Sequence, residues 1–152
     1  MAAADLAVLD GDHLRFVDQI PAPHRLRAVS AVGATFPLHS TANGKAVLAL
    51  LSDEEIGRLL PAKLPRHTPN TIGTRAALLQ ELADVREDGV AFDREEHTVG
   101  ISAAGFAFRD PAGRYAAVTV PMPTQRMAGR EKLLRARLAM SARDLAKAMN
   151  IR

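Results

Sequence analysis

Two tight turns, one near each end of the chain, place the strongest limit on the fold. Asp10-Gly11 lies between the apolar runs 6–9 and 13–17. The turn 110–113 lies between the apolar runs 101–108 and 115–120. An Asp-Gly turn between short apolar segments is typical of a β-hairpin, which joins antiparallel strands. We therefore expect antiparallel strand pairs at both ends of the chain.

The segment between the hairpins predicts three helices, over 41–51, 53–60 and 74–89. In the first, Val47, Leu50 and Leu51 recur at helical spacing, so all three are expected to point inward. Each helix is preceded by a residue type that caps helix N-termini. These capping residues are Ser40 or Thr41, Ser52 within a capping box, and Thr74. Gly89 is placed to end the third helix.

The remaining elements complete an antiparallel sheet. We expect a third strand that starts at 25–29 and ends near 32–33, a fourth over 90–93, and a last helix from about Gly129 to Met149. Pro121 and Pro123 are expected to end the last strand. Strands at both ends and helices between them define an α+β domain, with about six antiparallel strands and flanking helices.

Length and composition exclude several classes of protein. With 152 residues, the chain is expected to form one domain over 1–152. It has no cysteine, which excludes disulfides and thiol chemistry and fits a reducing cytoplasm. No apolar run approaches the roughly 20 residues of a membrane-spanning helix. Gly44-Lys45 is followed by Ala46 rather than Ser or Thr, so it is not a phosphate-binding P-loop, and no cofactor is expected.

Three clusters carry candidate chemistry, and each has a plain alternative. The N–H groups of residues 42–44 open a helix and suit a small anion; the alternative is an ordinary, tightly packed helix. Residues 93–97 include Asp93, Glu95, Glu96 and His97, which are metal-ligand types, but we favour a solvated charged loop and expect no metal. His39 suits a general base, and we favour a structural hydrogen bond.

The C-terminal stretch from Arg126 is basic. It carries Arg126, Arg130, Lys132, Arg135, Arg137, Arg143, Lys147 and Arg152 against Glu131 and Asp144. A basic helix can follow nucleic-acid phosphates. We favour a solvated outer face instead, because these residues are spread around the helix.

Two stretches resemble one family. Residues 37–46, PLHSTANGKA, are similar to the Pro-x-His-x-Thr/Ser-Ala/Gly-x-Gly-Lys-Ala signature of the IclR family of bacterial transcriptional regulators. Residues 89–101, GVAFDREEHTVGI, resemble that family's Gly-Tyr-Ala-x-Asp-x-Glu-Glu-x-x-x-Gly-x run. The run 6–11 and the hairpin 110–120 also lie at the expected distances, so the resemblance covers nearly the whole chain.

The resemblance implies a C-terminal effector-binding domain with a GAF-like fold. In the family this domain follows a DNA-binding winged helix-turn-helix, which we expect to be absent from this chain. The family's effector pocket lies between the sheet and the small-residue helix. The matching positions here are Ala42, Asn43, Gly44, Asp93, Ala103, Thr119 and Pro121, with a contribution from Val32 in the segment 29–32. Members often have Cys at the position of Ala103 and Ser at that of Pro121, so this pocket is expected to be less polar.

The resulting hypothesis is a ligand-sensing domain and not an enzyme. Its implied partners are a small organic acid and further copies of the chain in a homodimer or tetramer, with DNA bound only through the missing N-terminal domain. An aromatic monoacid bearing a hydroxyl is expected to fit better than a small diacid, because Asp93 repels a second acid group. The alternatives are an enzyme that uses His39 or Asp93 and an oligomerisation module with a vestigial pocket.

Overall fold

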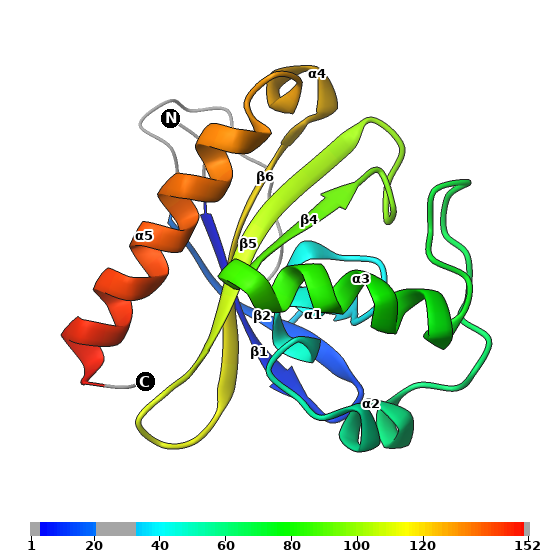
Figure 1. Cartoon of the computed structure of the whole chain (residues 1–152), viewed down its shortest axis with the longest axis horizontal. Coiled ribbons are helices and arrows are strands. Elements are labelled where there is room, and N and C mark those ends of the chain that lie inside the picture. Colours follow the sequence, from blue (N-terminus) through cyan, green and yellow to red (C-terminus); the bar gives the residue numbers. More distant parts are fainter. Residues whose placement is uncertain (1–3, 21–32, 151–152) are drawn as a thin grey trace.

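The computed structural model describes residues 4–20 and 33–150, with only the backbone of Ile20. Six antiparallel strands form one sheet in the order β3-β2-β1-β6-β5-β4 (Figure 1). The strands are β1 Ala4–Asp10, β2 His13–Ile20, β3 Thr35–Pro37, β4 Val90–Arg94, β5 Ile101–Arg109 and β6 Tyr115–Pro123. The predicted hairpins are the pairs β1–β2 and β5–β6. The predicted α+β class with a six-stranded antiparallel sheet is therefore confirmed.

Helices cover both faces of the sheet. They are α1 Ala42–Leu48, α2 Asp53–Leu59, α3 Arg75–Asp88, α4 Thr124–Met127 and α5 Glu131–Met149. One apolar core joins α1, α2 and α3 to the sheet, and a second joins α4 and α5 to the other face (Figure 1). Within the described ranges, no helix is long and apolar enough to cross a lipid bilayer.

The predicted caps account for where the helices of the first layer begin and end. Thr41 accepts the Gly44 N–H at 3.0 Å, and Thr74 caps α3 in the same way. Ser52 forms the full capping box with Glu55. Gly89 ends α3 with φ of 80°, a left-handed conformation that costs glycine little. These local signals are confirmed because each depends only on neighbouring residues.

The first helix is shorter than predicted. It ends at Leu48 instead of Leu51, so helical spacing does not apply to the last residues of the expected apolar face. Val47 and Leu51 are buried as expected, but Leu50 is 47% exposed. The prediction that Leu50 points inward was wrong for that reason.

Two predictions near the C-terminus were wrong in part. β6 ends at Pro123 as expected but continues through Pro121, and the two prolines pair with Ile101 and Ala103 of β5. Within the described residues, β6 pairs with β1 only as far as Thr119, so the prolines lie where no ladder N–H is needed on that side. Gly129, with φ of 76°, separates the unpredicted α4 from α5, so the last helix begins at Glu131. The predicted strand 25–29 lies outside the described residues.

Candidate functional site

A cavity of about 160 Å³ lies where the start of α1 faces β4, β5 and β6. Side chains from the sheet, from α1 and from the β4–β5 connection line it. They are Asp5, Phe36, Thr41, Ala42, Asn43, Asp93, His97, Thr98, Ile101, Ala103, Thr119 and Pro121. Five strands, β1, β3, β4, β5 and β6, therefore contribute side chains to one partly open cavity.

Six of the eight residues predicted for the effector site line this cavity. They are Ala42, Asn43, Asp93, Ala103, Thr119 and Pro121. Gly44 is not among the lining residues, and Val32 lies outside the described part of the chain. The structure thus brings most of the set together, while its role in binding stays a prediction.

Gly44 has a packing role instead. A Cβ atom on Gly44 would lie 2.4 Å from the carbonyl oxygen of Leu38 and 2.5 Å from its Cα. The Gly44 N–H donates to Thr41 Oγ1 at 3.0 Å and to Asn43 Oδ1 at 3.1 Å. The expectation that the N–H groups of all three residues 42–44 are unpaired was therefore wrong for Gly44. The N–H groups of Ala42 and Asn43 have no acceptor among the described residues.

Asp93 is the most perturbed acid at the cavity. Its side chain is 6% exposed, and burial raises its pKa from 3.8 to about 6. The Glu96 N–H donates to Asp93 Oδ1 at 2.7 Å, which holds the carboxyl group in place. At neutral pH Asp93 is therefore a buried, largely ionised hydrogen-bond acceptor at the cavity wall.

Asp5 is a second acid in the cavity, and it was not among the site residues predicted from the family resemblance. Burial also raises the pKa of Asp5, and Gln19 Nε2 donates to its Oδ1 at 2.9 Å. Thr119 lies directly across the ladder from Asp5, and its hydroxyl has no hydrogen-bond partner among the described residues. The two-residue period of a strand was the available signal, because it places Asp5 on the same face of β1 as the buried Ala7.

A buried ion pair connects the two family-like stretches below the cavity. Lys45 Nζ donates to Glu96 Oε1 at 2.8 Å and also to Glu81, and the Lys45 side chain is fully buried. The Arg94 N–H donates to Glu96 Oε2 at 3.0 Å. The expectation that residues 93–97 form a solvated loop was therefore wrong for Asp93 and Glu96, both of which are buried. Lys45 thus holds the turn that follows Asp93 at the end of β4.

Three histidines lie beside this turn. The rings of His39, His67 and His97 follow one another with centroids 5.5 Å apart at each step. His39 Nε2 lies 2.7 Å from the Pro65 carbonyl oxygen, and since that oxygen only accepts, Nε2 carries the proton. Burial lowers the pKa of His39 and of His97. His39 is thus a structural hydrogen-bond donor, and no metal-binding cluster occurs in the ranges that the structure describes.

The raised pKa of Asp93 predicts a specific effect of pH on stability. The folded state holds this proton between pH 3.8 and about 6 while the unfolded state does not, so unfolding free energy falls as pH rises through that range. The complete shift in the pKa of Asp93 corresponds to a change in unfolding free energy on the order of 3 kcal/mol. Asn in place of Asp93 keeps an acceptor for the Glu96 N–H but carries no charge. We expect Asp93→Asn to stabilise the domain at pH 8 by about 1–3 kcal/mol and to have little effect at pH 4.

Urea unfolding at the two pH values measures this difference. Asp84→Asn is the control, because Asp84 is exposed on α3; it should change stability little at either pH. Equal destabilisation by Asp93→Asn at pH 4 and pH 8 would show that the carboxyl group is not held at an energetic cost.

The comparisons with known proteins agree on one family. The family model described as "Bacterial transcriptional regulator IclR C-terminal" matches residues 2–150. The HTH-type transcriptional regulator Rv1719 of Mycobacterium tuberculosis is 55% identical over 127 residues, which cover 84% of this chain and 49% of that protein. The chain spans about half the length of the curated relatives that it matches most strongly.

Solved structures show the same fold. The C-terminal domain of the Escherichia coli transcriptional regulator KdgR is 30% identical with a TM-score of 0.80, covering 97% of this chain and 87% of that one. The inducer-binding domain of the Acinetobacter transcription factor PobR, as a double mutant in complex with 3-hydroxybenzoic acid, is 26% identical with a TM-score of 0.75. It covers 95% of this chain and 89% of that one. This chain belongs to the family of C-terminal domains of IclR-type bacterial transcriptional regulators.

Proposed function

We propose that this domain is the ligand sensor of a transcriptional regulator and that its effector binds in the 160 Å³ cavity. The observation that carries the proposal is the convergence of Asp93, Ala103 and Ala42 on that one space. The relatives are named as transcriptional regulators, which supports a regulatory role over an enzymatic one. His39 is occupied by the Pro65 carbonyl group, which argues further against a general base.

The cavity favours a small guest. Pockets for drug-sized ligands have volumes of about 300–1,000 Å³, and this one is smaller. The cavity has an apolar wall formed by Phe36, Ile101, Ala103 and Pro121. This wall is expected, because Ala103 and Pro121 stand where other members often have Cys and Ser. A single ring or a short aliphatic acid matches these dimensions.

The polar groups of the cavity select among such guests. The N–H groups of Ala42 and Asn43, which have no acceptor among the described residues, suit one acceptor group. Asp93 and Asp5 suit hydrogen-bond donors and repel a second carboxylate. A monoacid that also carries a hydroxyl satisfies both requirements. The PobR domain was solved with such a molecule, 3-hydroxybenzoic acid, and this supports the class of effector without fixing its identity.

Calorimetry with three related probes tests this selection. We expect 3-hydroxybenzoate to bind at least about tenfold more tightly than benzoate, because a hydrogen bond to a charged group contributes about 1.5–3 kcal/mol. Isophthalate should bind more weakly than benzoate because its second carboxylate meets Asp93 or Asp5. Ala103→Leu should abolish binding by filling the cavity, and Ala136→Leu, exposed on α5, is the matched control.

Other outcomes would favour the alternatives. Tighter binding of isophthalate than of 3-hydroxybenzoate would overturn the role given to the acids. Turnover of a bound acid would favour an enzyme, and no binding of any of the three would favour an oligomerisation module with a vestigial pocket.

In the full-length protein, we propose that effector binding changes DNA affinity by population shift. A ligand that binds one arrangement of a dimer or tetramer better than another moves the equilibrium between them. DNA contact is assigned to a part of the regulator outside these 152 residues, as the family resemblance implies. The basic residues of α5 are then a solvated face whose positions are not required for DNA recognition.

A further inference from the structure

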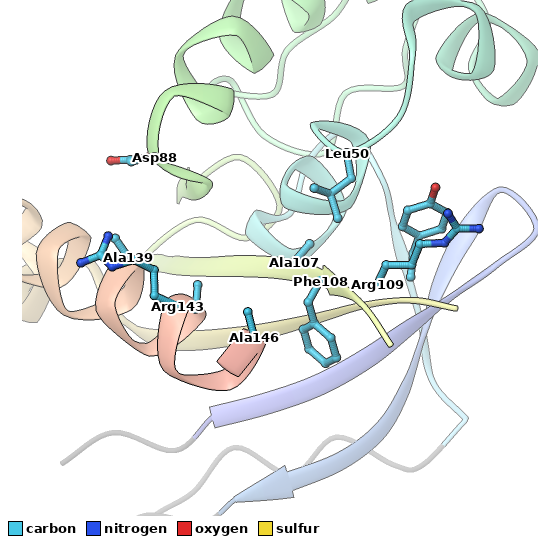
Figure 2. Close-up of a pocket in the computed structure, with 10 residues that line it drawn as sticks. Leu50, Asp88, Ala107, Phe108, Arg109, Ala139, Arg143 and Ala146 are labelled. Carbon is cyan, nitrogen blue, oxygen red and sulfur yellow. The ribbon is translucent and has the colours of Figure 1, made fainter. Parts of the chain in front are cut away.

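We propose that the domain has a second ligand site, a groove of about 440 Å³ at the far end of β5 that binds an amphipathic carboxylate. Its lining side chains come from α5, from the β5–β6 hairpin, and from the segments that follow α1 and end α3 (Figure 2). They are Leu50, Asp88, Ala107, Phe108, Arg109, Tyr115, Ala139, Ala142, Arg143 and Ala146. None of them lines the effector cavity.

The groove exists because β4 is shorter than β5. The last β4–β5 pair is Val90 with Phe106, so residues 107–109 of β5 continue without a strand on that side. β6 pairs with the other side of these residues. The C-terminal half of α5 flanks the open edge on one side, and Leu50 flanks it on the other (Figure 2).

The floor of the groove is apolar. Small side chains of α5, at Ala139, Ala142 and Ala146, leave space above Phe108. Leu50, which is 47% exposed, also lines this groove. The volume is within the range of about 300–1,000 Å³ that is usual for small-molecule sites. An alkyl chain or a larger ring would bury these surfaces from water.

The charged groups of the groove favour an anion. Asp88 is the only acid among the described residues that line it, and Arg135 pairs with Asp88 at 2.9 Å. Arg143 has no ion-pair partner in the part of the chain that the structure describes. Arg109 lies over the Tyr115 ring at 5.2 Å and donates its Nε–H to the Gly113 carbonyl group, which orients its guanidinium. Figure 2 shows the Arg143 and Arg109 side chains at opposite ends of the groove, so a carboxylate beside α5 would meet the Arg143 guanidinium alone.

Decanoate is the probe, because it joins an alkyl chain to one carboxylate, and decanol is its neutral counterpart. We expect calorimetry on the domain to show one decanoate site, with decanol at least about tenfold weaker. Arg143→Gln should weaken decanoate binding by about tenfold, whereas Arg137→Gln, exposed elsewhere on the same helix, should not change it. Ala142→Trp should abolish binding by filling the groove.

Several outcomes would overturn the proposal. Equal affinity of decanoate for the Arg143→Gln and Arg137→Gln variants would do so. Loss of decanoate binding in Ala103→Leu would place the ligand in the effector cavity instead. Absence of decanoate binding to the folded parent domain would also overturn it. So would light scattering in which Ala142→Trp dissociates a dimer, because the groove would then be an interface between copies. Thermal melting shows whether each variant is folded. If Ala142→Trp does not fold, the decanoate affinity of Arg143→Gln decides whether the proposal stands.

Discussion

Lys45→Met is expected to lower the free energy of unfolding by about 3–5 kcal/mol, because it leaves a buried carboxylate without its cation. Lys45 is fully buried and bonds to Glu96, whose side chain is only 6% exposed. Methionine has a similar length and fills the same space, so the loss reports the missing charge rather than a cavity. The turn after Asp93, whose Glu96 N–H donates to the Asp93 carboxylate, should loosen at the same time.

Chemical denaturation of the single and double variants measures this effect. Glu96→Gln removes the stranded charge, so Lys45→Met combined with Glu96→Gln should be more stable than Lys45→Met alone. Arg114→Met is a control, because Arg114 forms an exposed pair with Asp110 whose contribution is about 0–1 kcal/mol. A loss below about 1 kcal/mol for Lys45→Met would show that the buried pair does not hold the two stretches together.

Gly44→Ala is expected to destabilise the domain by about 3 kcal/mol or more, the upper part of the range for overpacked cores. The added Cβ would lie 2.4–2.7 Å from three backbone atoms of Leu38, and backbone cannot rotate away as a side chain can. The larger Gly44→Val should be worse. This change therefore tests packing of α1 against the preceding segment and not the shape of the effector cavity.

Gly57→Ala is the matched control, because Gly57 lies within α2 and a Cβ there meets nothing within 4 Å. It should stabilise the domain by about 0.5–1 kcal/mol, the usual difference between alanine and glycine in a helix. Urea unfolding compares the two variants. Similar effects of Gly44→Ala and Gly57→Ala would contradict the close approach of α1 to Leu38.

The features that could be predicted from the sequence are either local or part of the motifs shared with the family. The turn at Asp10-Gly11 and the caps at Thr41, Ser52 and Thr74 depend on neighbours within four residues. The cavity residues came from the resemblance, because alternation and spacing alone do not bring Ala42 and Ala103 together.

The features that were missed depend on distant parts of the chain. Lys45 and Glu96 are 51 positions apart, and both are polar, so nothing in the sequence indicates that they are buried together. Pro121 remains in β6 at a position beyond Thr119, the last β6 residue that pairs with the described part of β1, and this is a property of the sheet. Leu50 is exposed because α1 ends early, at a point without a helix-breaking residue.

Methyl NMR of the alanine-labelled domain during titration with 3-hydroxybenzoate is the most direct test of the effector site. Ala42 and Ala103 line the cavity, whereas Ala139 and Ala142 line the separate groove on α5. We expect saturable shifts of the Ala42 and Ala103 methyl signals, with those of Ala139 and Ala142 unchanged. Shifts confined to Ala139 and Ala142, or none at millimolar ligand, would contradict it.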